Sequence, residues 1–244
     1  MSQLLTPGLR EIDSPIVIEN PFVVVCEGSG DARFVFELLK IRKIQNCSVG
    51  FPNEMDAGSG GKDAIGRYID SISNWFSLHS ERPLQGILIL IDADDDPRSA
   101  FGLACKALQD AGLHAPSRAF ACETGESKEG NPVTVAVYLI PGPMQNGVQE
   151  TGTLEDILLR AAFEKNPQFE GCLDAFIGCI GKAPELKSNK KAKMRLSALV
   201  GASFPSNPWA SVDKLLASSK NDLVPIDSIH FKPLGDFLAN FCTE

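Results

Sequence analysis

One stretch constrains the fold more than any other: residues 86–97 read Gly-Ile-Leu-Ile-Leu-Ile-Asp-Ala-Asp-Asp-Asp-Pro. A short, continuous apolar run bounded by Gly and Pro is typical of a strand that is buried on both faces, as in a parallel sheet. The carboxylates that follow it therefore lie where the strand leaves the sheet. In open α/β sheets, ligands bind at this edge, beyond the carboxyl ends of the strands. Because neighbouring carboxylates repel one another, a bound divalent cation would make the cluster tolerable.

The elements around this strand predict an α/β fold with a mostly parallel central sheet. Apolar runs and helical spacing alternate along the first half of the chain: strands are expected at 22–26, 47–51 and 87–91, and helices at 32–43, 62–78 and 97–112. This alternation is typical of a Rossmann-like sheet with right-handed crossovers. Two further strands, 118–122 and 133–140, flank a polar turn. We expect them to form an antiparallel hairpin at an edge of the sheet.

The length of the chain, 244 residues, suits one large α/β domain with a small helical appendage. We interpret residues 1–20 as an N-terminal lead-in, 21–165 as the α/β core and 166–244 as a helical C-terminal extension packed on the core. A helix is expected to begin after Thr153, and a last helix is expected at 234–241.

The composition of the chain argues against several classes of protein and against one kind of metal site. The net charge of −8 argues against a generally basic nucleic-acid coat, although a local basic patch would still bind nucleic acid. The seven cysteines form no Cys-x-x-Cys pair and the three histidines are far apart, which argues against a structural zinc site. Reduced, mostly buried thiols are typical of a cytoplasmic protein. We expect no signal peptide, and no run approaches the ~18 apolar residues of a membrane span.

Three acids form the strongest candidate site. Glu27 directly follows the strand at 22–26, and Asp92 and Asp94 follow the strand at 87–91. If the extended conformation persists, Asp92 and Asp94 point the same way, which suits Mg²⁺ or Mn²⁺ held through oxygens. The alternative, helix capping, accounts for Asp95 and Asp96 before Pro97 but not for these three acids. Ser29 or Asp31 could cap the helix that follows Glu27.

A further acid, Glu155, is open to two interpretations. Thr153 and Asp156 have the spacing of a capping box, which accounts for Asp156. Glu155 then faces the loop edge, where it either supplies another acidic ligand or has no such role.

The glycine-rich loop at 58–61 precedes Lys62 but does not match a P-loop, because Asp56 and Asp63 replace the residues that the motif needs. A glycine-rich helix start can still bind phosphate, so Gly61 and Lys62 are candidate phosphate ligands; ordinary turn chemistry is the alternative. The Gly28-Ser-Gly30 segment is not a dinucleotide-binding fingerprint, because Arg33 stands at the third glycine position.

A basic run covers residues 187–195. On a helix, positions 187, 190, 191 and 194 share one face, whereas Lys193 turns away from it. One interpretation is a charged helix face exposed to solvent. The other is that these side chains contact phosphate beside Glu27, Asp92 and Asp94.

Taken together, these motifs resemble the Toprim domain, the acidic metal-binding fold of topoisomerases, DnaG-type primases and OLD-family nucleases. The segments that carry the likeness are Val-Val-Cys-Glu27-Gly, Gly60-Gly-Lys-Asp63, Leu-Ile-Asp92-Ala-Asp94 and Gly152-Thr-Leu-Glu-Asp156. The chain is most similar to small stand-alone bacterial Toprim-like proteins related to the OLD branch. The likeness runs through about residues 20–200.

The resemblance implies a Mg²⁺ or Mn²⁺ site made by Glu27, Asp92 and Asp94, with Glu155 as a further ligand. In the nuclease members, two metals flank a phosphodiester and activate water. Carried over, Glu27 is a ligand or general base, and Lys193 or Lys190 stabilises the developing phosphate charge.

The resemblance has two departures. The loop before Gly152 reads Pro-Gly-Pro-Met-Gln-Asn where an Asp-Asn pair is expected, and the sequence includes no ATPase domain of the kind found in full-length OLD proteins. The leading hypothesis is a Mg²⁺-dependent nuclease, a hydrolase acting on nucleic acid. The alternative is a non-catalytic Toprim module that binds metal and nucleic acid, a partner protein or a second copy of itself.

Overall fold

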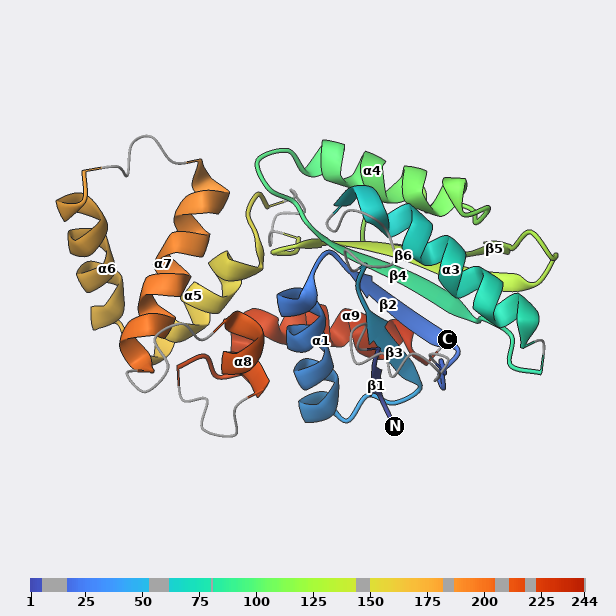
Figure 1. Ribbon diagram of the computed structural model, residues 1–244, viewed down its shortest axis with the longest axis horizontal. Coiled ribbons are helices and arrows are strands. Elements are labelled where there is room, and N and C mark those ends of the chain that lie inside the picture. Colours follow the sequence, from blue (N-terminus) through green and yellow to red (C-terminus); the bar gives the residue numbers. More distant parts are fainter. Residues whose placement is uncertain are drawn as a thin grey trace, which may run out of the picture.

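The structure is a computed structural model that describes residues 1–5, 17–52, 62–79, 81–143, 150–181, 187–204, 211–217 and 223–243. Figure 1 shows a sheet with helices on both faces and a group of helices that extends beyond one end of it. None of the helices in these ranges combines the length and the apolar character that crossing a membrane requires.

The described strands form one sheet of six in the order β1-β3-β2-β4-β6-β5. Their bounds are β1 Gln3–Leu4, β2 Phe22–Cys26, β3 Cys47–Gly50, β4 Gly86–Asp92, β5 Cys122–Glu126 and β6 Pro132–Ile140. Every neighbouring pair is parallel except β5–β6, which is antiparallel and lies at the edge. The predicted mostly parallel, Rossmann-like α/β sheet and its edge hairpin are confirmed.

Helices cover both faces of this sheet. They are α1 Ser29–Arg42, α3 Ile65–Leu78, α4 Pro97–Asp110, α5 Leu154–Lys165, α6 Gln168–Cys179, α7 Ser188–Ser203, α8 Val212–Ala217 and α9 Lys232–Phe241, with 3₁₀ turns at Lys62–Ala64 and Ile229–Phe231. Helices α3 and α4 pack on one face, and α1 and α9 on the other (Figure 1).

The alternation of side chains along the strands explains why the central strands are continuously apolar. Val24, Leu88 and Leu90 pack on the α1 side, whereas Val23 and Ile87 pack on the α3–α4 side. Because successive side chains of a strand point to opposite faces, a strand covered on both sides must be apolar at every position. The α1-side cluster continues through α5, α6, α7 and α9, so these helices share a core with the sheet.

Some boundaries differ from the sequence-based expectation. Residues 1–20 are more than a lead-in, because Gln3–Leu4 pair with β3 and Leu5 is buried. A two-residue strand has no periodic pattern to recognise. The first hairpin strand, expected at 118–122, runs instead over Cys122–Glu126, so it begins at the last residue of the expected strand and extends into the expected turn. Its residues are largely polar because an edge strand leaves one side open to solvent.

Candidate functional site

The candidate site lies where the chain leaves the two central strands in opposite directions. From β2 it passes into α1 on one face of the sheet, and from β4 into α4 on the other face. The two strands are adjacent and parallel, with Cys26 opposite Leu90. Glu27 follows β2 directly, and Asp92 is the last residue of β4. Such a topological switch point is where ligands bind in open α/β sheets.

Asp92 is the most enclosed acid of this edge, with 6% of its surface exposed. Its Oδ1 accepts a hydrogen bond of 2.9 Å from the backbone N–H of Leu154, which docks the start of α5 on the end of β4. Burial raises the pKa of Asp92 well above its usual range, and the charges of Asp31, Glu27 and Glu155 raise it further. Burial beside three other acids favours the protonated form of Asp92 when no divalent cation is bound.

Asp94 does not continue the strand. It has a φ of 50°, and its backbone exchanges two hydrogen bonds of 2.8 Å with Gly152. Its carboxylate pairs with the ammonium of Lys62 and accepts a 3.0 Å hydrogen bond from Asn189 Nδ2 on α7. Burial acts to raise the pKa of Asp94, but the hydrogen bonds from Lys62 and Asn189 outweigh burial and lower it. The expectation that Asp92 and Asp94 point the same way fails, because β4 ends at Asp92 and the two carboxylates bond to different elements.

Asp31 belongs to the same group of acids, although the sequence suggested only a capping role. It lies in the first turn of α1, whose N-cap is Gly28 with no side-chain cap. Burial, followed by the charges of Glu27 and Glu155, raises the pKa of Asp31 to about 7. The signal in the sequence was its position four residues after Glu27, in the first turn of the helix that follows Glu27.

Glu27 and Glu155 each present one buried carboxylate oxygen, Oε2, that has no hydrogen-bond partner. Burial raises the pKa of Glu27, against the lowering effect of Lys62 and Lys193. A buried acceptor without a hydrogen bond is costly, and the nearest cation to Glu27 Oε2 among the described residues is Lys62 Nζ at 3.8 Å, so both oxygens can still accept a ligand.

The acids Glu27, Asp31, Asp92, Asp94 and Glu155 together form the acidic edge of the sheet. Two lysines bring positive charge to it. Lys62, a candidate phosphate ligand, contacts the acids Glu27 and Asp94; Gly61, the other candidate, lies outside the described residues. Burial would lower the pKa of Lys193, but the carboxylates, Glu155 and Asp92 foremost, raise it. Lys193 therefore interacts with the acidic edge, although helical spacing set it apart from the main basic face. Lys190 is exposed.

The acids are close enough to interact but do not form a ready-made metal centre. Among the residues that the structure describes, no group of three or more His, Cys, Asp or Glu side chains is arranged to hold a metal ion. The hydrogen bonds explain this: Leu154 holds the carboxylate of Asp92, and Lys62 with Asn189 holds that of Asp94.

The acids assigned to capping largely have that role. Asp96 is the N-cap of α4 and accepts a 3.1 Å hydrogen bond from the Ser99 N–H. Thr153 and Asp156 form the predicted capping box of α5. Asp95 differs, because its carboxylate accepts a hydrogen bond from Ser188 Oγ at the start of α7.

Gly152 is required by the geometry that joins α5 to β4. Its φ is +134°, and an added Cβ would lie 2.9 Å from Asp156 Oδ2 of the capping box.

We expect Gly152→Ala to destabilise the protein by about 1–3 kcal/mol, measured by urea unfolding. Gly102→Ala is the matched control, because nothing lies within 4 Å of its added Cβ in helix α4. The control should gain about 0.5–1 kcal/mol; equal effects of the two substitutions would contradict this role for Gly152.

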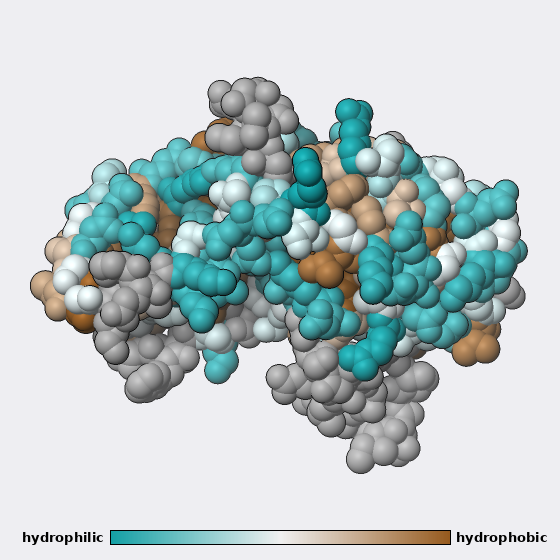
Figure 2. All heavy atoms as spheres, turned by 90° about the horizontal axis from the view of Figure 1, so that it is seen from above, coloured by the Kyte–Doolittle hydropathy of each residue, from teal (hydrophilic) through white to brown (hydrophobic). Residues whose placement is uncertain are grey.

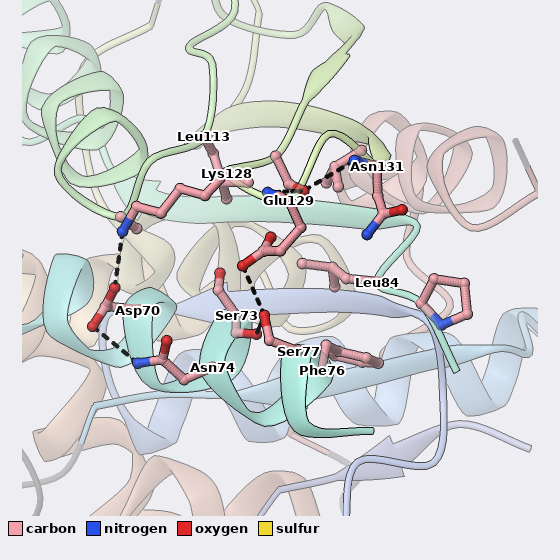
Figure 3. A pocket seen from close by; sticks show the side chains of 14 residues that line it. Asp70, Ser73, Asn74, Phe76, Ser77, Leu84, Leu113, Lys128, Glu129 and Asn131 are labelled. Carbon is pink, nitrogen blue, oxygen red and sulfur yellow. Dashed lines mark hydrogen bonds and ion pairs between the residues drawn. The ribbon is translucent and has the colours of Figure 1, made fainter. Parts of the chain in front are cut away.

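Two hollows lie elsewhere on the described surface. A pocket of about 340 Å³ lies at the opposite edge of the sheet, between α3 and the β5–β6 turn. Its polar groups largely pair with one another, Lys128 with Asp70 and Glu129 with Ser77 (Figure 3). An apolar hollow of about 680 Å³ lies between α6 and α7 and includes the exposed Phe176. Figure 2 shows apolar residues at this end of a mostly hydrophilic surface. Among the described residues, neither hollow is lined by a buried carboxylate oxygen that lacks a hydrogen bond, whereas the acidic edge has two, from Glu27 and Glu155.

Comparison with known proteins identifies the family of the chain. No curated protein and no solved structure is similar enough to match the chain. A family model described as "Protein of unknown function (DUF3226)" matches residues 21–239, which span the sheet, the acidic edge and the C-terminal helices. The chain therefore belongs to the DUF3226 family.

Proposed function

We propose that the protein is a Toprim-like phosphodiesterase that cleaves nucleic acid with the help of Mg²⁺ or Mn²⁺ at the acidic edge. The observation that carries the proposal is that Glu27, Asp31 and Asp92 lie together at a topological switch point, where burial raises the pKa of each and the charges of neighbouring carboxylates raise it further. Buried carboxylates that raise one another's pKa values are typical of functional sites. A divalent cation would relieve this repulsion.

The residues present fit such a cation. The unpartnered oxygens of Glu27 and Glu155, with the carboxylate of Asp92, form a set of hard oxygen donors of the kind that Mg²⁺ and Mn²⁺ prefer. When bound, the cation would supply Lewis-acid activation of the phosphate and of water. Asp94 would complete the ligand set after leaving Lys62, and Glu27 would serve as a ligand or as general base.

Lys193 is the residue best suited to hold the substrate phosphate. Its ammonium interacts with five carboxylates of the edge, and Lys193 is exposed. It would stabilise the charge that develops on the phosphate during cleavage. Lys190 lies one turn before Lys193 on α7 and would bind the neighbouring phosphate of the nucleic acid.

A second function, a non-catalytic module that binds metal and nucleic acid or a partner protein, is favoured by one observation. The described acids include no group of three already arranged around a metal position. Such a module would hold a cation without the geometry that activates water. The buried free thiols of Cys26, Cys47 and Cys242 support a reducing, cytoplasmic location for either function.

The test is incubation of the protein with single- and double-stranded DNA and RNA, with Mn²⁺, with Mg²⁺ and with EDTA. Cleavage that requires the cation is the expected result. Binding should also weaken steeply with added salt, because phosphate contacts release counterions. Cation-dependent binding without cleavage would favour the module, and cleavage that persists in EDTA would contradict both functions.

A further inference from the structure

The ammonium of Lys62 lies among the oxygens of the acidic edge. Its Nζ donates hydrogen bonds to the backbone carbonyl of Asp92 at 3.1 Å and to the carboxylate of Asp94, and it lies 3.8 Å from Glu27 Oε2. Only 20% of the Lys62 side chain is exposed. A cation supplied by the chain itself therefore occupies this edge.

The groups around this ammonium are those that a hard divalent cation takes. They comprise one backbone carbonyl and two carboxylates, from the end of β4 and from the residue after β2. Mg²⁺ and Mn²⁺ bind carboxylate and carbonyl oxygens. An ammonium and a divalent cation cannot share these oxygens, because like charges a few ångströms apart repel strongly.

Lys62 also determines the direction of Asp94. The carboxylate of Asp94 bonds to Lys62 through Oδ2 and to Asn189 through Oδ1, so both of its oxygens are engaged. This accounts for the absence, among the described residues, of an acidic group already arranged around a metal. Removing the ammonium would release Asp94 Oδ2 and leave Glu27 Oε2 with no positive group at 3.8 Å.

We propose that Lys62 is a tethered counter-ion: its ammonium occupies the oxygens of the acidic edge, and a divalent cation must displace it in order to bind. The inference rests on the proposed metal-dependent function and adds a mode of regulation: the lysine sets the cation concentration at which the site opens. A lysine with only a structural role would contribute stability and leave cation affinity unchanged. A counter-ion competes, so its removal should strengthen cation binding.

The first experiment measures Mn²⁺ affinity from the electron paramagnetic resonance signal of free Mn²⁺. Lys62→Gln, which removes the charge, should bind Mn²⁺ about tenfold or more tightly than the unaltered protein, since a close opposite charge shifts carboxylate equilibria by 1–3 pH units. Lys106→Gln is the matched control, because Lys106 is exposed on α4. It should leave the affinity unchanged.

The outcomes separate the two proposals. Equal or weaker Mn²⁺ binding by Lys62→Gln, with binding still abolished by Asp92→Asn, would overturn the counter-ion role and leave the metal site standing. No Mn²⁺ binding by any variant would overturn both.

A second measurement needs no variant and so does not depend on Lys62→Gln folding. Lysines of the unaltered protein are labelled with an amine-reactive reagent, with and without Mg²⁺, and each site is quantified by mass spectrometry. Labelling of Lys62 should rise several-fold with Mg²⁺, while that of Lys106 stays constant. Labelling of Lys62 that does not respond to Mg²⁺ would contradict displacement.

Discussion

Replacing Asp92 by Asn is expected to lower cation-dependent cleavage of nucleic acid by about a thousandfold, because the cation that would activate the phosphate and water loses a charged ligand. Asn keeps the shape of the side chain and an oxygen that can accept the 2.9 Å hydrogen bond from Leu154. It lacks the charge needed to hold a divalent cation. The measurement is the initial rate of cleavage at a fixed Mn²⁺ concentration that saturates the unaltered protein.

Stability distinguishes this effect from misfolding. Asp92 is buried among acids that raise its pKa, so removing its charge should leave the metal-free protein as stable as before or more so. Asp110→Asn is the matched control, because Asp110 is the exposed last residue of α4. Its rate should equal that of the unaltered protein. Undiminished cleavage by Asp92→Asn would remove Asp92 from the site.

The metal-free protein is expected to lose stability as pH rises from about 4 to above 7. Asp31 titrates near 3.8 when unfolded and at about 7 when folded. Between these pH values the folded state binds more protons than the unfolded state. The contribution of Asp31 to folding stability is therefore fully present below its unfolded pKa and is lost as pH rises through its folded pKa. For Asp31 alone the change is at most about 4 kcal/mol. The raised pKa values of Glu27 and Asp92 act in the same direction, and the lowered pKa of Asp94 acts in the opposite direction.

Urea unfolding at a series of pH values in EDTA measures this dependence. Asp31→Asn mimics the protonated carboxyl, so its profile should be flatter and its stability at pH 8 should exceed that of the unaltered protein. The charges that face Asp31 are those of Glu27, Glu155, Asp92 and Lys193. Mn²⁺ should therefore stabilise the unaltered protein more at pH 8 than at pH 5.5, because protons compete for the same oxygens. A pH profile unaffected by Asp31→Asn would contradict the assignment.

Several features could be predicted from the sequence because they depend on neighbours along the chain. The continuous apolar runs of β2 and β4 identify strands covered on both faces, and the carboxylates after them indicate the functional edge. Asp96 and the Thr153–Asp156 pair cap helices through bonds that span three residues, so their roles also follow from local spacing.

Other features depend on contacts between distant segments, and only the tertiary structure decided them. Asp94 takes its left-handed conformation while bridged to Gly152, and its carboxylate turns to Lys62 and Asn189. Lys193 reaches the acids because α7 packs on α5, not because of its place in the basic run.

The apolar run that ends in acids at residues 86–97 thus determined the central strand and the edge at which a ligand is expected. The sequence alone did not determine which oxygens are free at that edge. Strand and cap propensities act over a few residues, whereas the direction of a carboxylate depends on the charges and donors that folding brings within about 4 Å of it. In the tertiary structure, Asp92 accepts a hydrogen bond from the backbone of Leu154 and Asp94 accepts one from Lys62. One buried oxygen each of Glu27 and Glu155 accepts no hydrogen bond.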